Sequence, residues 1–82
     1  MGKHDRTRAA IDAEPVRANI KWSDIEALFR HLGAEISEGR GSRVRVALND
    51  IKAVFHRPHP SKETSKPTIE SVRGFLERAG VT

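Results

Sequence analysis

The sequence contains no cysteine, and this absence excludes disulfide bonds and metal sites built from thiolates. No stretch approaches the roughly 20 consecutive apolar residues that a membrane-spanning helix requires, so no membrane segment is predicted. The basic N-terminal residues are not followed by an apolar segment, and we therefore predict no secretory signal. The default expectation is a cytoplasmic protein without membrane contact.

What remains is the composition of one small globular domain with a polar surface. The chain has 82 residues, of which 37% are hydrophobic and 32% are charged, so only a modest core can be buried. The formal net charge is +4 at pH 7, which favours an anionic partner, and nucleic acid is the commonest such partner. Charge alone is weak evidence, because many small basic domains bind nothing in particular.

The N-terminal residues 1–20 mix charges of both signs, contain Pro15 and show no sustained apolar period. We predict that they form a flexible tail with at most a transient helical turn, and that residues 21–82 form the folded domain. His4 lies in this segment and is expected to have no role.

Two amphipathic helices are predicted, one on each side of a strand-rich segment. The first begins at Ser23, which forms a capping-box pattern with Glu26, and it ends at Gly33. The second begins near Pro67 and ends at Gly80. Apolar residues at helical spacing predict one buried face for each helix. These residues are Ile25, Leu28, Phe29 and Leu32 in the first helix, and Ile69, Val72, Leu76 and Ala79 in the second.

Between the helices the sequence predicts a short strand over residues 34–38 and then a β-hairpin. The hairpin turn falls at Asn49 and Asp50, a polar pair between two alternating runs. Because side chains alternate along a strand, this turn gives the hairpin one apolar face and one cationic face. The predicted pairs are Leu48–Ile51, Val46–Ala53 and Val44–Phe55 on the apolar face, and Ala47–Lys52, Arg45–Val54 and Arg43–His56 on the other.

The predicted order of elements is therefore α-β-β-β-α. This is an α+β fold in which two helices pack on one face of a three-stranded antiparallel sheet. The opposite face of the sheet is left to solvent or to a partner.

The sequence from residue 22 to residue 81 resembles the HicA family of bacterial toxins, which has a double-stranded-RNA-binding-domain-like fold. The similarity lies in the order and spacing of short motifs over most of the chain. These motifs are the Leu32-Gly33 helix end, the Gly41-Ser42 pair before the second strand, Pro58-His59-Pro60 after the third strand, and the last helix with its Arg78-Ala79-Gly80-Val81 end.

The resemblance implies a small endoribonuclease, an mRNA interferase, that is neutralised by a HicB-like antitoxin covering its active site. In most of the family a histidine regarded as catalytic follows Gly-Ser, whereas this sequence has Arg43. The family histidine of the third-strand motif is retained as His59. The predicted register places His56 opposite Arg43, where its imidazole would take nearly the same place as the missing one.

A metal-independent ribonuclease needs a base for the 2′-hydroxyl proton, an acid for the leaving 5′-oxygen, and cations beside the phosphorane. Histidine suits the first two tasks and arginine the third. We therefore expect catalysis by His56, His59 and Arg43 without metal or cofactor, in a protein that is a monomer when free of antitoxin. The residues expected to contact RNA are Arg40, Ser42, Arg43, Arg45, Lys52 and Arg57.

Several alternatives stay open. The two histidines could be strand-end residues that hydrogen-bond a loop, and the arginines could simply blunt an exposed sheet face. His56 and His59 could bind a metal, although no carboxylate is placed nearby to complete the site. The chain could be a non-catalytic RNA-binding module of the same fold, with Arg43 in place of the histidine. It could also be a protein-interaction domain whose basic face docks an acidic partner.

Overall fold

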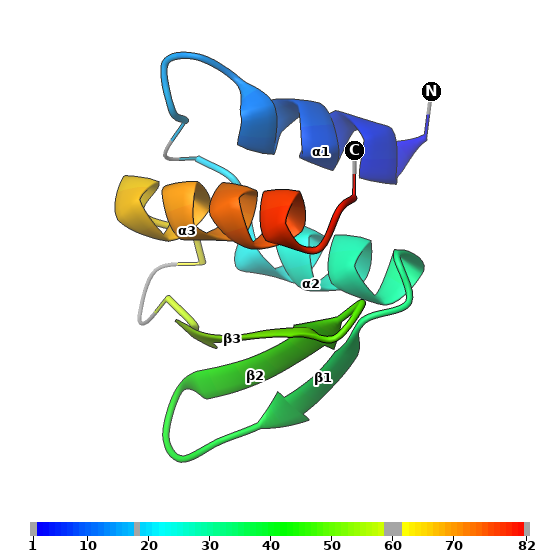
Figure 1. Cartoon of the computed structure of the whole chain (residues 1–82). Coiled ribbons are helices and arrows are strands. Elements are labelled where there is room, and N and C mark those ends of the chain that lie inside the picture. The colour runs from blue at the N-terminus through cyan, green and yellow to red at the C-terminus, as the bar shows by residue number, and fades with distance from the viewer. Residues whose placement is uncertain (1, 18, 59–61, 82) are drawn as a thin grey trace.

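The computed structural model describes residues 2–17, 19–58 and 62–81 of the chain. Its elements are α1 (Lys3–Asp12), α2 (Trp22–His31), β1 (Glu35–Glu38), β2 (Arg43–Leu48), β3 (Ile51–His56) and α3 (Lys66–Arg78). The strands form one antiparallel sheet in the order β1-β2-β3. Helices α2 and α3 lie on one face of the sheet, and α1 lies on the side of these helices remote from it (Figure 1). The predicted α+β class is confirmed, with α1 as an additional first helix.

The register of the β2–β3 hairpin is the one predicted from the sequence, in all six pairs. Asn49 and Asp50 have φ angles of 51° and 67°, as a two-residue type I′ turn requires. The Asn49 side chain also donates a hydrogen bond of 2.8 Å to the Ala79 carbonyl oxygen. The turn is therefore tied to the end of α3, which holds the apolar face of the hairpin against the helices.

The core lies between the sheet and helices α2 and α3. Trp22, Phe29, Phe55 and Phe75 meet there, and the centroids of neighbouring rings are 5.6 to 6.4 Å apart. All four side chains are buried. Because large aromatic side chains dominate the energetics of small cores, this cluster holds both helices to β3.

Helix α2 begins differently from the prediction. Its first residue is Trp22 and its N-cap is Lys21, with no capping hydrogen bond from a side chain. The capping box predicted at Ser23 is wrong, because the Glu26 carboxylate accepts hydrogen bonds from the Trp22 indole and from Arg57 instead. A long-range contact has therefore replaced the local one.

The other helix boundaries agree closely with the sequence pattern. Helix α3 begins at Lys66, with Pro67 in its first turn, one residue before the predicted start. Gly33 and Gly80 follow the last turns of α2 and α3 with φ angles of 92° and 75°. The predicted glycine helix ends are confirmed, since this left-handed conformation is one that other residues adopt rarely.

The structure differs from the flexible tail predicted over residues 1–20, because Lys3–Asp12 form α1 and its Ile11 side chain is fully buried. Arg73 of α3 donates hydrogen bonds of 2.8 and 3.1 Å to the Ile11 carbonyl oxygen and one of 2.9 Å to that of Ala13. It also pairs with Glu14 at 2.7 Å. These bonds satisfy carbonyl groups that the end of a helix leaves without intrahelical partners.

The N-terminal end of α1 is attached to α2. The rings of His4 and His31 stack with centroids 4.3 Å apart and an interplanar angle of 14°. The Lys3 ammonium lies 3.2 Å from a carboxylate oxygen of Asp24. His4, which was expected to have no role, is therefore one of the contacts that hold α1 in place.

The burial of Ile11 predicts that α1 contributes to stability. Replacing Ile11 with alanine should lower the free energy of unfolding by about 2–5 kcal/mol, because it leaves a cavity beneath α1. Urea unfolding measures this change. The control is Val54→Ala, which truncates an aliphatic side chain that is 55% exposed, and it should cost less than about 0.5 kcal/mol. Equal, small effects of the two substitutions would show that α1 is not packed on the domain.

Candidate nucleic-acid interface

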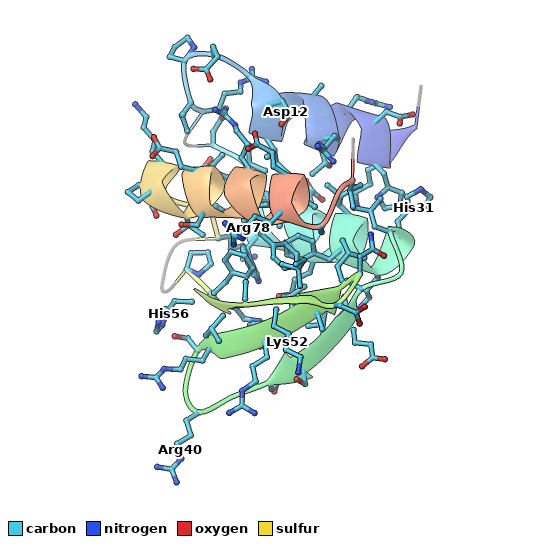
Figure 2. The ribbon with its side chains drawn as sticks, viewed as in Figure 1. Asp12, His31, Arg40, Lys52, His56 and Arg78 are labelled. Carbon is cyan, nitrogen blue, oxygen red and sulfur yellow. The ribbon has the colours of Figure 1, made fainter. Side chains whose placement is uncertain are left out.

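The face of the sheet opposite the helices carries exposed polar side chains, and we call it the outer face. Arg43 and Arg45 reach it from β2, and Lys52 and His56 reach it from β3. Figure 2 shows Lys52 and His56 along the part of the sheet remote from α1, and Arg40 extending from the β1–β2 turn. The structure thus brings these five predicted site residues to one side of the molecule.

The structure describes no carboxylate partner for the cations of the outer face. Within the described part of the chain, no Asp or Glu oxygen lies within 4.0 Å of the side-chain nitrogens of Arg40, Arg43, Arg45 or Lys52. Neighbouring like charges on a sheet repel one another. An anion placed among them relieves that repulsion, so the outer face is suited to a phosphate backbone.

The strand register places the imidazole of His56 among these cations. It is exposed at the end of β3 and lies directly opposite Arg43 of β2. Directly opposite residues of an antiparallel pair have Cβ atoms about 4.5–5.5 Å apart, so one ligand can touch both side chains. A guanidinium can bind a phosphate there while the imidazole exchanges a proton.

The chain that leaves β3 stays close to the turn before β2. The Arg57 backbone N–H donates a hydrogen bond of 2.9 Å to the carbonyl oxygen of Ser42, whose side chain is exposed. Gly41 precedes it with a φ angle of 62°, a conformation that suits glycine. The backbone two residues before His59 is therefore fixed beside Arg43, and His59 itself lies outside the described residues.

Arg57 makes contacts that the sequence analysis missed. Its Nε lies 2.9 Å from Glu26 Oε2, and its Nη1 lies 2.6 Å from Glu38 Oε1. Glu26 is buried and also accepts a hydrogen bond from the Trp22 indole. Arg57 thus joins the end of β3 to α2 and β1. The guanidinium that was expected to contact RNA forms ion pairs with two carboxylates of the same chain.

This ion-pair network determines the charge state of Glu26. Burial acts to raise the pKa of Glu26, but hydrogen bonds from Arg57 and Trp22 outweigh it, so the pKa lies below its usual value of 4.5. The hydrogen bonds to Glu26 and Glu38 raise the pKa of Arg57 in turn. The contact is therefore a charged pair throughout the neutral pH range.

Within the described residues, no group of three or more histidine, aspartate or glutamate side chains is arranged to hold a metal ion. None of the helices described by the structure is long and apolar enough to cross a membrane.

The sequence was compared with known protein families. A family described as the HicA toxin of bacterial toxin-antitoxin systems matches residues 22–81, which contain α2, the sheet and α3. The chain belongs to the HicA toxin family. Comparisons with curated proteins and with solved structures found no match. Membership of the family gives the chain a toxin role and implies an antitoxin as its partner. The matched residues begin after α1, so the match does not include this helix.

The Glu26–Arg57 pair predicts a pH-dependent stability of this HicA protein. Replacing Glu26 with glutamine should lower the free energy of unfolding by about 1–3 kcal/mol at pH 7, because the variant lacks the charge that Arg57 binds. A carboxylate whose pKa is depressed in the folded state stabilises above its unfolded pKa, and this contribution disappears as the pH falls through the folded pKa. The difference between parent and variant should therefore shrink when the pH is lowered from 7 to well below the usual value of 4.5, as measured by urea unfolding.

The matched control for this HicA variant is Glu70→Gln, which changes an exposed carboxylate of α3. It should alter the free energy of unfolding by less than about 0.5 kcal/mol at either pH. A Glu26→Gln deficit of the same size at both pH values would contradict the assignment of a charged pair.

Proposed function

We propose that the chain is a metal-independent endoribonuclease that cleaves messenger RNA on the outer face of its sheet, and that a HicB-like antitoxin inhibits it by covering this face. The observation that carries the proposal is the placement of exposed His56 opposite Arg43 among cations that have no carboxylate partner within the described chain. Membership of a toxin family supports it.

The RNA backbone is held by the cations of the outer face. Arg43 and Arg45 follow each other at alternate positions of β2, and Lys52 lies across the hairpin on β3. Arg40 and the Ser42 hydroxyl extend this surface into the β1–β2 turn. The grip is electrostatic, so the affinity for RNA falls steeply as the salt concentration rises.

Cleavage uses the 2′-hydroxyl of the RNA as the nucleophile. One histidine takes the 2′-hydroxyl proton, the 2′-oxygen attacks the adjacent phosphorus, and the bond to the 5′-oxygen breaks. The second histidine gives a proton to the leaving 5′-oxygen, which yields a 2′,3′-cyclic phosphate and a 5′-hydroxyl. His56 and His59 are the acid–base pair, and the Arg43 guanidinium neutralises charge that develops on the phosphorane.

Arg57 has a positioning role in this mechanism. Its contacts with Glu26 and Glu38 hold the backbone that links His56 to His59. Arg57 therefore holds the chain that follows His56, and the cations of the outer face supply the contacts with phosphate.

The proposal predicts a large loss of cleavage when His56 is replaced with alanine. The rate should fall by about 10²–10⁴-fold, because one proton transfer loses its catalyst. The assay is cleavage of single-stranded messenger RNA by the full chain in EDTA, and His59→Ala should behave in the same way. His31→Gln is the control, because His31 stacks on His4 at the far side of the molecule and should leave the rate unchanged.

Thermal unfolding of His56→Ala should match that of the parent, since the side chain is exposed. Cleavage by the folded His56→Ala variant at the parental rate would refute its catalytic role.

A second candidate function follows from Arg43, which comes directly after Gly41-Ser42, where most of the HicA family has a histidine. With that imidazole missing, the chain would be a non-catalytic RNA-binding module that recognises shape and phosphate. Intact RNA that shifts on a gel in the presence of the parent chain would support the module and contradict the nuclease. A gain of cutting by Arg43→His would then identify Arg43 as the cause.

A further inference from the structure

The outer face is hollowed beside the Arg43–His56 pair, and we call this feature the outer hollow. It has a volume of about 590 Å³ and spans all three strands. This volume lies within the range of roughly 300–1,000 Å³ that small-molecule sites occupy. The side chains that alternate outward around it are Glu35, Ser37, Arg45, Ala47, Lys52 and Val54.

The strand register arranges these six side chains in two rows across the sheet. Neighbouring rows are two residues apart along each strand, a step of about 7 Å. The base of a nucleotide next to a phosphate bound at Arg43 is within reach of such a step. The rows are Ser37–Arg45–Val54, adjacent to Arg43–His56, and Glu35–Ala47–Lys52 beyond it.

The floor of the outer hollow is apolar although the surrounding surface is cationic. Val54 is 55% exposed and is the only large hydrophobic residue with high exposure among those the structure describes. Ala47 lies beside it, and both line the outer hollow. A flat nucleobase can lie on this apolar floor, and the planar guanidinium of Arg45 can stack on the base. The outer hollow therefore suits the base of a nucleotide whose phosphate is bound nearby.

Among the described residues that line the outer hollow, Glu35 is the only one with a carboxylate. It is exposed, and no described lysine, arginine or histidine nitrogen lies within 4.0 Å of its oxygens. A carboxylate on a surface that binds phosphates weakens binding unless the ligand donates hydrogen bonds to it, so its presence selects among ligands. An ionised carboxylate only accepts hydrogen bonds, through two oxygens side by side.

Guanine is the base whose edge matches this acceptor. Its N1–H and N2–H₂ groups donate in parallel to the two oxygens of one carboxylate. Adenine and cytosine offer one amino group beside an acceptor nitrogen, and uracil offers one N–H between two carbonyl oxygens. Only guanine therefore makes two hydrogen bonds to Glu35 without bringing an acceptor against it.

We propose that the outer hollow is a nucleobase site in which Glu35 selects guanine at the nucleotide next to the phosphate held by Arg43. Lys52 lies across Ala47 from Glu35 in the same row, where its ammonium can donate to the O6 of guanine. This inference rests on the proposed RNA-binding function and adds to it the base that is recognised.

The test is the affinity of the full chain for short uracil-rich RNA oligomers that carry one central guanine, inosine, adenine or cytosine. Fluoro groups at the 2′ positions prevent cleavage, so the readout, fluorescence anisotropy, does not depend on nuclease activity. The parent should bind the guanine oligomer about tenfold more tightly than the adenine oligomer, as one bidentate base contact allows. Inosine lacks the N2 amino group and should lie between them.

The decisive variant is Glu35→Gln. It should bring the four affinities within about twofold of one another, and it should not weaken binding of an all-uracil oligomer, because a negative charge is removed from the RNA site. Glu70→Gln is the control on α3 and should keep the preference for guanine.

Equal affinity of the parent for guanine and adenine, or a preference for guanine that persists in Glu35→Gln, would overturn the inference. Either result would leave the proposed nuclease function intact if the same chain cleaves RNA without metal. A guanine preference lost in Glu35→Gln, in a chain that never cuts natural RNA, would instead uphold the base site and refute the nuclease. No binding of any oligomer at low salt would contradict both and would assign the outer face to a protein partner.

Discussion

The register of the β2–β3 hairpin is the constraint on which the rest of this protein depends. The turn at Asn49 and Asp50 fixes that register, and a slip of one residue by either strand would move the core side chains of that strand to the outer face. In the observed register, Val44 and Phe55 enter the aromatic core, and the residues between the buried ones face outward. The turn therefore determines both the core and the charged outer face, because alternation along each strand places the side chains between the buried ones on the outer face.

Elements with local signals were predictable from the sequence. The hairpin has alternating apolar residues around a two-residue turn, and α2 and α3 have apolar residues at helical spacing before a glycine. Helix α1 was missed because it has no such stripe and is held by Arg73, which lies 62 residues beyond Ile11. Glu26 was misassigned for the same reason, since its partner Arg57 is 31 residues away and local spacing suggested a helix cap. Patterns of neighbouring residues carry no information about contacts over such distances.

The candidate site shows the same division. Arg43, Arg45, Lys52 and His56 share a face because strand alternation places them there, and this was predictable. Arg57 follows β3 directly and resembled a further phosphate ligand in the sequence, but a buried carboxylate and an exposed one bind it. These contacts, together with the bond from its backbone N–H to the Ser42 carbonyl oxygen, hold the chain beside the Gly41-Ser42 turn. The three layers of sheet, paired helices and α1 leave the outer face as the uncovered side of the sheet (Figure 1).

The chemical ends of the RNA products test the central claim most directly. Attack by the 2′-hydroxyl with histidine acid–base catalysis leaves a 2′,3′-cyclic phosphate on one fragment and a 5′-hydroxyl on the other, and it proceeds in EDTA. The account predicts these ends, which mass spectrometry of a short cleaved RNA identifies. Fragments with 3′-hydroxyl and 5′-phosphate ends, or cleavage that requires a divalent metal, would contradict it.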